Sequence, residues 1–161
     1  MAGLIIDRES GQVYAPMDVA NAFIRMGLEK NQPVTHMKLH KLLYYAQGYY
    51  LAQFDQRLFN GAFKKWQFGP VCPGVYKVLK TDDRLLTNVS AQGKDVTDPD
   101  DRAYLESIWK RYGQYSGMQL SKLSHSETPW IEAEINDFIP DDSIKSYFIG
   151  LLENTRSTSR V

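Results

Sequence analysis

Two histidines lie four residues apart, the spacing that places two imidazoles on one face of a helix. His36 and His40 have the spacing of the two histidines in a helical zinc site. Such a site also needs a glutamate directly after the first histidine and a third ligand. Position 37 is methionine, and His125 or Glu127 could supply a ligand only if the fold brought them close. We therefore expect His36 and His40 to be surface or structural residues, and we expect no metal and no other cofactor.

A serine, a histidine and a glutamate occur together in the segment SHSE, residues 124–127. Catalytic triads depend on side chains that converge in space, and four adjacent residues cannot all point at one reaction centre. The single cysteine, Cys72, lies between Val71 and Pro73, an apolar setting that leaves a thiol inert. The chain also has no phosphate-binding glycine loop, dinucleotide fingerprint, nucleophile elbow or zincin motif. These patterns predict a protein that is not an enzyme, with His125 in a structural role.

Basic and aromatic residues are interleaved over residues 33–80, which carry seven basic side chains and one acidic side chain, Asp55. Such a surface could follow a phosphate backbone while its rings stack on bases. The same composition is typical of the anchor residues in protein–protein interfaces. The whole chain has 19 basic and 19 acidic side chains and no recognisable nucleic-acid reader motif. Protein binding is therefore favoured, and nucleic-acid binding stays an alternative.

The opposite charge gathers near the C-terminus, where residues 127–142 contain six acidic side chains and no basic one. The two charged segments either face each other in the fold or present separate surfaces to a partner. Solvated faces that partly neutralise each other are the favoured interpretation, because exposed charges contribute little individually.

The composition is that of an ordinary folded domain. The chain has 161 residues, 43% of them hydrophobic and 24% charged, which suits one domain with a real core and argues against disorder. A single cysteine allows no disulfide framework and fits a reducing compartment. The sequence shows no signal-peptide pattern and no apolar run long enough to cross a bilayer. We expect a soluble cytoplasmic protein without a membrane partner.

The elements that must position these residues are mostly helical. Periodic apolar residues predict helices over residues 15–30, 35–54, 74–80, 100–115, 118–123 and 142–154. Residues 63–68 alternate as a short strand would, and Gly69-Pro70 is expected to end it. Residues 81–98 predict a loop or small hairpin, and residues 124–130 a helix exit or tight turn. The predicted fold is mainly α, a compact single domain (residues 16–154) around a central helix, with a small β element near residues 63–68, an N-terminal extension (1–15) and a frayed tail (155–161).

The helix over residues 35–54 is the predicted centre, because it is apolar around most of its circumference. Thr35 is its expected N-cap. Tyr49 and Tyr50 fall on the wide core stripe, whereas Tyr44 and Tyr45 lie on its two flanks and could be either core or contact residues. Gly48 would let another backbone approach closely.

Three segments in this order resemble one family. They are KLHKLLYYAQG (38–48), WQFGPV (66–71) and LSKLSHSETPW (120–130). Together they resemble the SocA-like, or Panacea, antitoxin domain, whose members are often phage-associated or GepA-like proteins, and the resemblance spans about residues 16–135. His40 stands where glutamine is typical, and Ser124 stands where threonine is commoner.

The resemblance implies a non-enzymatic antitoxin that is encoded beside its toxin, often on a prophage or other mobile element. Such a domain neutralises its toxin by direct protein contact, and the flanks of the motif helix become the candidate toxin-facing surface. The expected partner-binding residues are Lys38, Lys41, Tyr44, Tyr45, Trp66 and Phe68. The motif residues expected to be structural are Leu42, Leu43, Gly48, Gly69, Pro70, His125, Pro129 and Trp130.

Three other functions remain open at this point. The protein could be a nucleic-acid-binding regulator of its own operon, or an adaptor that delivers a partner protein to a protease. A hydrolase built around His125 is the outsider. In any binding role, the strand near residues 63–68 could pair with a partner strand if it lies at a sheet edge.

Overall fold

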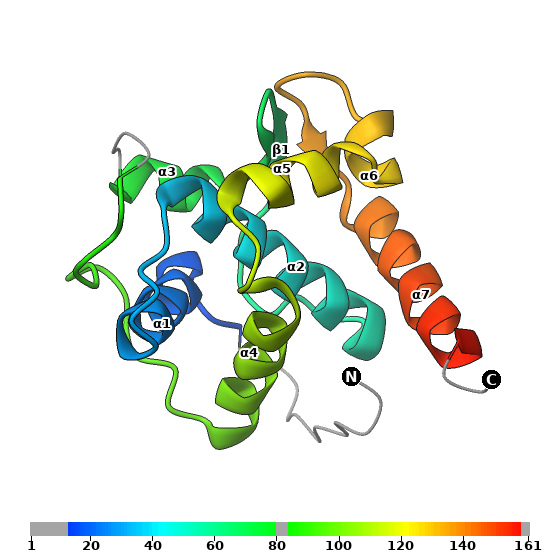
Figure 1. The fold of residues 1–161 in the computed structure, drawn as a ribbon. Coiled ribbons are helices and arrows are strands. Elements are labelled where there is room, and N and C mark those ends of the chain that lie inside the picture. The colour runs from blue at the N-terminus through cyan, green and yellow to red at the C-terminus, as the bar shows by residue number, and fades with distance from the viewer. Residues whose placement is uncertain (1–12, 80–83, 159–161) are drawn as a thin grey trace.

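In the computed structural model, six helices and a small sheet are arranged around a long helix, α2 (Figure 1). The structure describes residues 13–79 and 84–158, with side chains up to residue 154. Its helices are α1 (Pro16–Glu29), α2 (His36–Phe54), α3 (Pro73–Leu79), α4 (Pro99–Tyr112), α5 (Gly117–His125), α6 (Thr128–Glu132) and α7 (Asp141–Thr158). Its strands are β1 (Phe63–Trp66), β2 (Gly69–Val71) and β3 (Phe138–Ile139). The predicted fold class, mainly α with a small β element, is confirmed. Within the described residues, no helix combines the length and apolar character needed to span a membrane.

Helix α2 begins and ends where the local chemistry requires. The hydroxyl of Thr35 accepts a hydrogen bond from the Lys38 amide at 3.2 Å, so the expected N-cap is present. Asp55 ends the helix in a left-handed conformation. Between these ends, every residue from Leu39 to Leu51 is buried, because α1, α4, α5 and α7 all pack against this helix.

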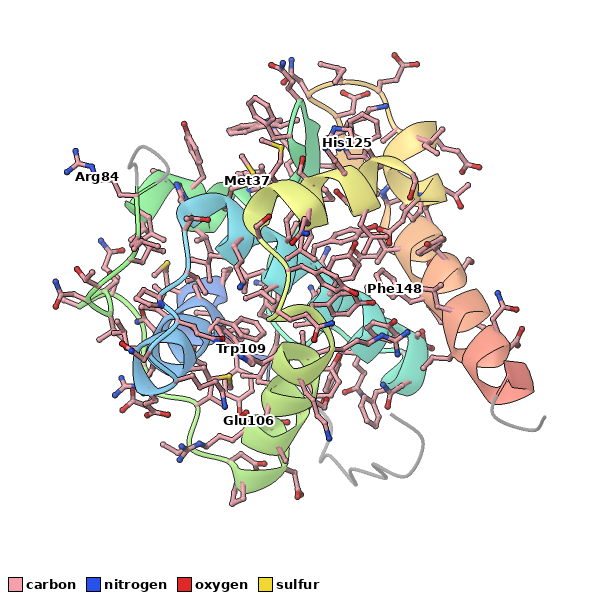
Figure 2. The ribbon with its side chains drawn as sticks, viewed as in Figure 1. Met37, Arg84, Glu106, Trp109, His125 and Phe148 are labelled. Atoms are coloured by element: carbon pink, nitrogen blue, oxygen red, sulfur yellow. The ribbon has the colours of Figure 1, made fainter. Side chains whose placement is uncertain are left out.

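The packing of α7 on α2 depends on a glycine. A Cβ atom on Gly48 would lie 2.2 Å from the ring of Phe148, a distance that carbon atoms cannot occupy. The missing side chain lets α7 cover the Tyr44 flank of α2, which the sequence alone did not assign to core or surface. Phe148 is labelled at this contact in Figure 2. Tyr44 lies on that flank and is fully buried.

The small sheet differs from the expected element in two ways. Its strand order is β2-β1-β3, with both pairs antiparallel, so β1 is the central strand and not an edge. The condition for pairing with a partner strand, that this strand lie at a sheet edge, is therefore not met, because both of its sides are already paired. Gly69 and Pro70 do not end the β structure either. They begin the returning strand of a hairpin, in which Trp66 pairs with Gly69.

Two other segments also fold differently from the expectation. Residues 124–130 contain more than a turn, because α6 begins at Thr128. The last helix, α7, continues to Thr158, so residues 155–158 of the predicted tail are helical. The predicted N-terminal extension lies outside the described residues up to position 12. Tyr14, near the end of that predicted extension, is described, and its backbone amide donates to the Leu58 carbonyl at 3.1 Å.

The two oppositely charged segments lie against each other. Arg57 and Asp141 form an ion pair at 2.7 Å, and β1 pairs with β3 between them. The Lys65 ammonium donates to the carbonyl oxygen of Ala133 at 2.9 Å. The charge segregation in the sequence therefore reflects two neighbouring parts of one fold.

Candidate protein-binding site

The turn between β1 and β2 is held in an unusual way by side chains from three helices. We call residues 66–70, Trp-Gln-Phe-Gly-Pro, the tip. Gly69 has a φ of 109°, which favours glycine, and a Cβ there would lie 2.7 Å from both Lys41 Cε and Ser124 Oγ. Gly69 and Pro70 are buried, whereas Gln67 and Phe68 are exposed, and the Phe68 side chain is 50% exposed. The backbone of the tip thus lies on the helices while an aromatic ring faces solvent.

Two polar side chains from α2 and α5 hold the tip from below. The ammonium group of Lys41, a residue only 1% exposed, donates to the Pro70 carbonyl at 3.0 Å. The Ser121 hydroxyl donates to the Phe68 carbonyl at 2.7 Å. Both bonds satisfy carbonyl groups that the hairpin leaves unpaired, and a buried carbonyl without a donor costs free energy.

Two ring nitrogens from α5 and α6 hold the other half of the tip. His125 Nε2 lies 2.6 Å from the Gln67 carbonyl, and because a carbonyl only accepts, this nitrogen donates the hydrogen bond. The other ring nitrogen, Nδ1, contacts the carbonyl of Ser121, one turn earlier in α5. The indole nitrogen of Trp130 donates to the Trp66 carbonyl at 3.2 Å. The rings of His125 and Trp130 also contact each other edge to face, with their centroids 4.1 Å apart. Four of the five tip carbonyls therefore accept a bond from a side chain on a helix.

The start of α5 is fixed by its own sequence, which places Ser121 and His125 under the tip. The Ser116 hydroxyl accepts from the Gln119 amide at 3.1 Å, and the Gln119 side chain accepts from the Ser116 amide at 2.8 Å. This reciprocal capping box sets the first turn of the helix. Gly117, Ser121 and Ser124 then form a face of small residues, on which the tip and α2 can lie closely.

Three of the six expected contact residues are not on the surface. Lys41, Tyr44 and Tyr45 are buried, so the expectation of an exposed flank on α2 is wrong for them. The reason is that α7 covers the Tyr44 flank, while α4 and α5 cover the Tyr45 flank, where the ring of Tyr45 stacks on Tyr112 at 4.1 Å. Patterns in α2 alone cannot show which neighbours cover a flank.

The other three expected contact residues are at least partly accessible. Lys38 is half-buried, and its ammonium group donates to the Gly113 carbonyl, with burial lowering its pKa. Trp66 is half-buried and contacts the Tyr76 ring edge to face at 4.9 Å. Phe68 has the most exposed side chain of the six.

Exposed apolar residues near the tip were not predicted. Tyr76 on α3 and Met118 and Leu123 on α5 are exposed, and none was expected to contact a partner. The spacing of the small residues on α5 was the available signal, because it marks the face that another backbone approaches and so places Met118 and Leu123 outside that face.

A buried glutamate lies beneath the same helices. Glu127, between α5 and α6, accepts a hydrogen bond at Oε2 from the Tyr45 hydroxyl at 3.1 Å. Its other oxygen, Oε1, and the Tyr44 hydroxyl are buried without a hydrogen-bond partner among the described residues. Burial raises the pKa of Glu127 to about 7, although the hydroxyls of Tyr45 and Tyr147 partly oppose the shift. The uncharged form of a carboxyl is favoured where water is excluded.

The two histidines of α2 join that helix to the start of α3. His40 Nδ1 accepts from the Cys72 amide at 3.1 Å, so His40 Nε2 carries the proton and donates to His36 Nε2 at 2.9 Å. Burial lowers the pKa of His40, which favours this neutral tautomer. Among the described residues, no three histidine, cysteine or carboxylate side chains are grouped closely enough to hold a metal ion.

Comparison with known protein families identifies the domain that contains this site. The family model for the antitoxin SocA-like Panacea domain matches residues 39–131, from α2 to α6. The chain belongs to this antitoxin family. The Panacea match includes the tip and all four side chains that hold it. The predicted family resemblance is therefore confirmed.

The Panacea chain also resembles a curated protein along most of its length. It is 32% identical to the protein named Antitoxin SocA of Caulobacter vibrioides (strain NA1000 / CB15N) over 124 residues. The alignment covers 70% of this chain and 66% of that protein. No solved structure matches the chain.

Proposed function

We propose that this protein is an antitoxin that neutralises a cognate protein toxin by direct binding, and that it acts without catalysing a reaction. Its family and its similarity to a protein named Antitoxin SocA support the antitoxin role. As the family resemblance implies, the toxin is encoded by a neighbouring gene, often on a prophage or other mobile element. In this proposal the pair acts in the cytoplasm.

The observation that carries the binding mechanism is the bonded tip. Lys41, Ser121, His125 and Trp130 hold four of its carbonyls while Phe68 faces solvent. A segment that is already ordered loses less conformational entropy when it binds, which favours affinity. An aromatic ring on such a segment is typical of the anchors that dominate binding energies. The motif residues thus serve binding indirectly, by fixing the shape of the tip.

A growth assay tests the proposal. The neighbouring gene is induced alone and together with this protein, and tagged protein is then purified from the second culture. We expect growth arrest in the first culture, rescue in the second, and a stable complex of the two proteins after purification.

Two results would contradict direct neutralisation. Rescue accompanied by disappearance of the neighbouring protein, without a complex, would identify an adaptor for proteolysis. A harmless neighbouring protein would remove the antitoxin role, and binding to nucleic acid would then be measured at several salt concentrations.

A further inference from the structure

We propose that the toxin binds one end of this molecule. The contact site on the toxin would be an apolar pocket surrounded by acidic groups. This inference rests on the proposed antitoxin function and adds the chemistry of the partner. The binding surface comprises the tip and the exposed sides of α3 and α5, and we call it the tip face. Its exposed residues include Phe68, Tyr76, Lys77, Met118, Lys122 and Leu123.

The tip face is apolar at its centre. Its four large hydrophobic side chains are each between 40 and 52% exposed: Phe68, Tyr76, Met118 and Leu123. Exposed hydrophobic residues scattered singly are normal, but a group of them beside an ordered turn indicates an interaction site. Aromatic residues and methionine are the types enriched in interface cores.

Contacts between elements bring the tip, α3 and α5 together at this end of the molecule. The Ser121 hydroxyl bonds the Phe68 carbonyl, so α5 lies directly against the tip. The Tyr76 ring contacts Trp66 at 4.9 Å and stacks on His36 at 5.3 Å, so α3 lies beside both β1 and the first turn of α2. Figure 2 shows Met37 in that first turn between α3 and α5.

The charge of this end is positive. The segments that form it, residues 56–79 and 113–126, contain no aspartate or glutamate. Lys77 and Lys122 are exposed, and neither forms an ion pair with another described residue. The exposed carboxylates Glu132 and Glu134 lie on α6 and directly after it, outside these two segments. Complementary charge on a partner is therefore negative.

A protein fits this surface better than a nucleic acid does. Nucleic-acid sites neutralise several phosphates with lysine and arginine and stack bases on aromatic rings in series. Here the central side chains include the aliphatic Leu123 and the thioether Met118, and the net charge of the chain is zero. An apolar centre with a few cations around it is the arrangement of a protein interface.

The test measures binding of the purified product of the neighbouring gene to variants of this protein. Phe68→Ala removes the proposed anchor, and we expect the dissociation constant to rise about 30-fold, equivalent to about 2 kcal/mol. The matched control is Phe138→Ala, because Phe138 is 56% exposed on β3, outside the tip face. We expect this control to bind within about twofold of the unsubstituted protein.

A second pair of variants tests the charge. The double variant Lys77→Glu with Lys122→Glu should slow association on the order of tenfold at low ionic strength, with a smaller effect at physiological salt. Its control is Lys94→Glu with Lys110→Glu, which changes the net charge equally at two exposed lysines outside the tip face. Circular dichroism and thermal unfolding verify that all four variants fold.

Each outcome bears on a different claim. If the unsubstituted protein rescues growth and binds, but the tip-face variants bind as their controls do, the tip-face inference is wrong and the antitoxin proposal stands. If the unsubstituted protein neither rescues nor binds, both fall. If the lysine double variant loses only affinity for a single-stranded oligonucleotide, the face binds nucleic acid and the protein-partner inference is overturned.

Discussion

The substitution Glu127→Gln should remove a pH-dependent destabilisation from the fold. In the unsubstituted protein, Glu127 is buried below α5 and α6 and has a pKa of about 7, compared with 4.5 for an ordinary glutamate. A raised carboxyl pKa means that the folded state holds the proton more tightly than the unfolded state does. The folded state therefore loses stability as the pH rises from about 4.5 to about 7.

The size of the effect follows from the difference between the two pKa values. That difference, between 4.5 and about 7, corresponds to roughly 3 kcal/mol at 1.36 kcal/mol per pKa unit. Glutamine keeps an oxygen that can accept from the Tyr45 hydroxyl, but it carries no charge. We therefore expect the free energy of unfolding of the variant to exceed that of the unsubstituted protein by a margin that grows to about 3 kcal/mol above neutral pH.

Urea unfolding of both proteins at a series of pH values between about 4.5 and 8 measures this margin. The control is Glu132→Gln, because Glu132 is exposed on α6 and its charge is solvated. A constant difference between Glu127→Gln and the unsubstituted protein across this range would refute the reasoning. A margin that shrinks as the pH rises would show that the buried carboxylate is instead stabilised by its neighbours.

Three further predictions concern the scaffold. The first two are measured by urea unfolding, and the third by urea unfolding together with binding of the purified product of the neighbouring gene. Gly48→Ala should destabilise the fold by about 3 kcal/mol, because its Cβ would overlap the Phe148 ring of α7. The control Gly150→Ala, with nothing within 4 Å of its Cβ, should be neutral or stabilising by up to about 1 kcal/mol. Equal effects of the two substitutions would contradict the packing argument. Gln47→Leu should cost about 2–4 kcal/mol, because the amide makes four hydrogen bonds to the loop after α2, and a loss below about 1 kcal/mol would contradict that role. Lys41→Met should lower the free energy of unfolding and, by loosening the tip, also weaken toxin binding. The control Lys110→Met, at an exposed lysine, should change neither quantity. Unchanged binding by a folded Lys41→Met protein would contradict the role of this lysine.

The sequence was sufficient to predict the described helices other than α6, and the central position of α2. Apolar residues around most of that helix and Thr35 before it carry this information locally. The sequence was insufficient for β2 and β3, because strands of three and two residues have almost no periodicity. Gly69-Pro70 is chemically a turn signal, and its pairing with Trp66 and Lys65 makes it the start of a strand.

The candidate contact residues were harder to predict than the fold. A lysine next to tyrosines usually indicates a surface, yet Lys41 is buried because the Pro70 carbonyl lies within reach of its ammonium group. Tyr45 is buried because Glu127, distant in the sequence, accepts a hydrogen bond from its hydroxyl. Both contacts join segments far apart in the chain, so no local pattern reports them. Phe68 was predicted to be a contact residue of the strand over residues 63–68. In the structure it lies instead in the turn between β1 and β2, where its side chain is exposed.

Hydrogen exchange tests the central claim, that a toxin binds the tip face, most directly. The exchange rates of backbone amides are compared for this protein alone and in complex with the product of the neighbouring gene. The structure predicts slower exchange in the complex at residues 66–71 and along α3 and α5, with α1 and α4 unchanged. Protection confined to α1 and α4, or to the acidic segment around Glu132 and Glu134, would contradict the claim.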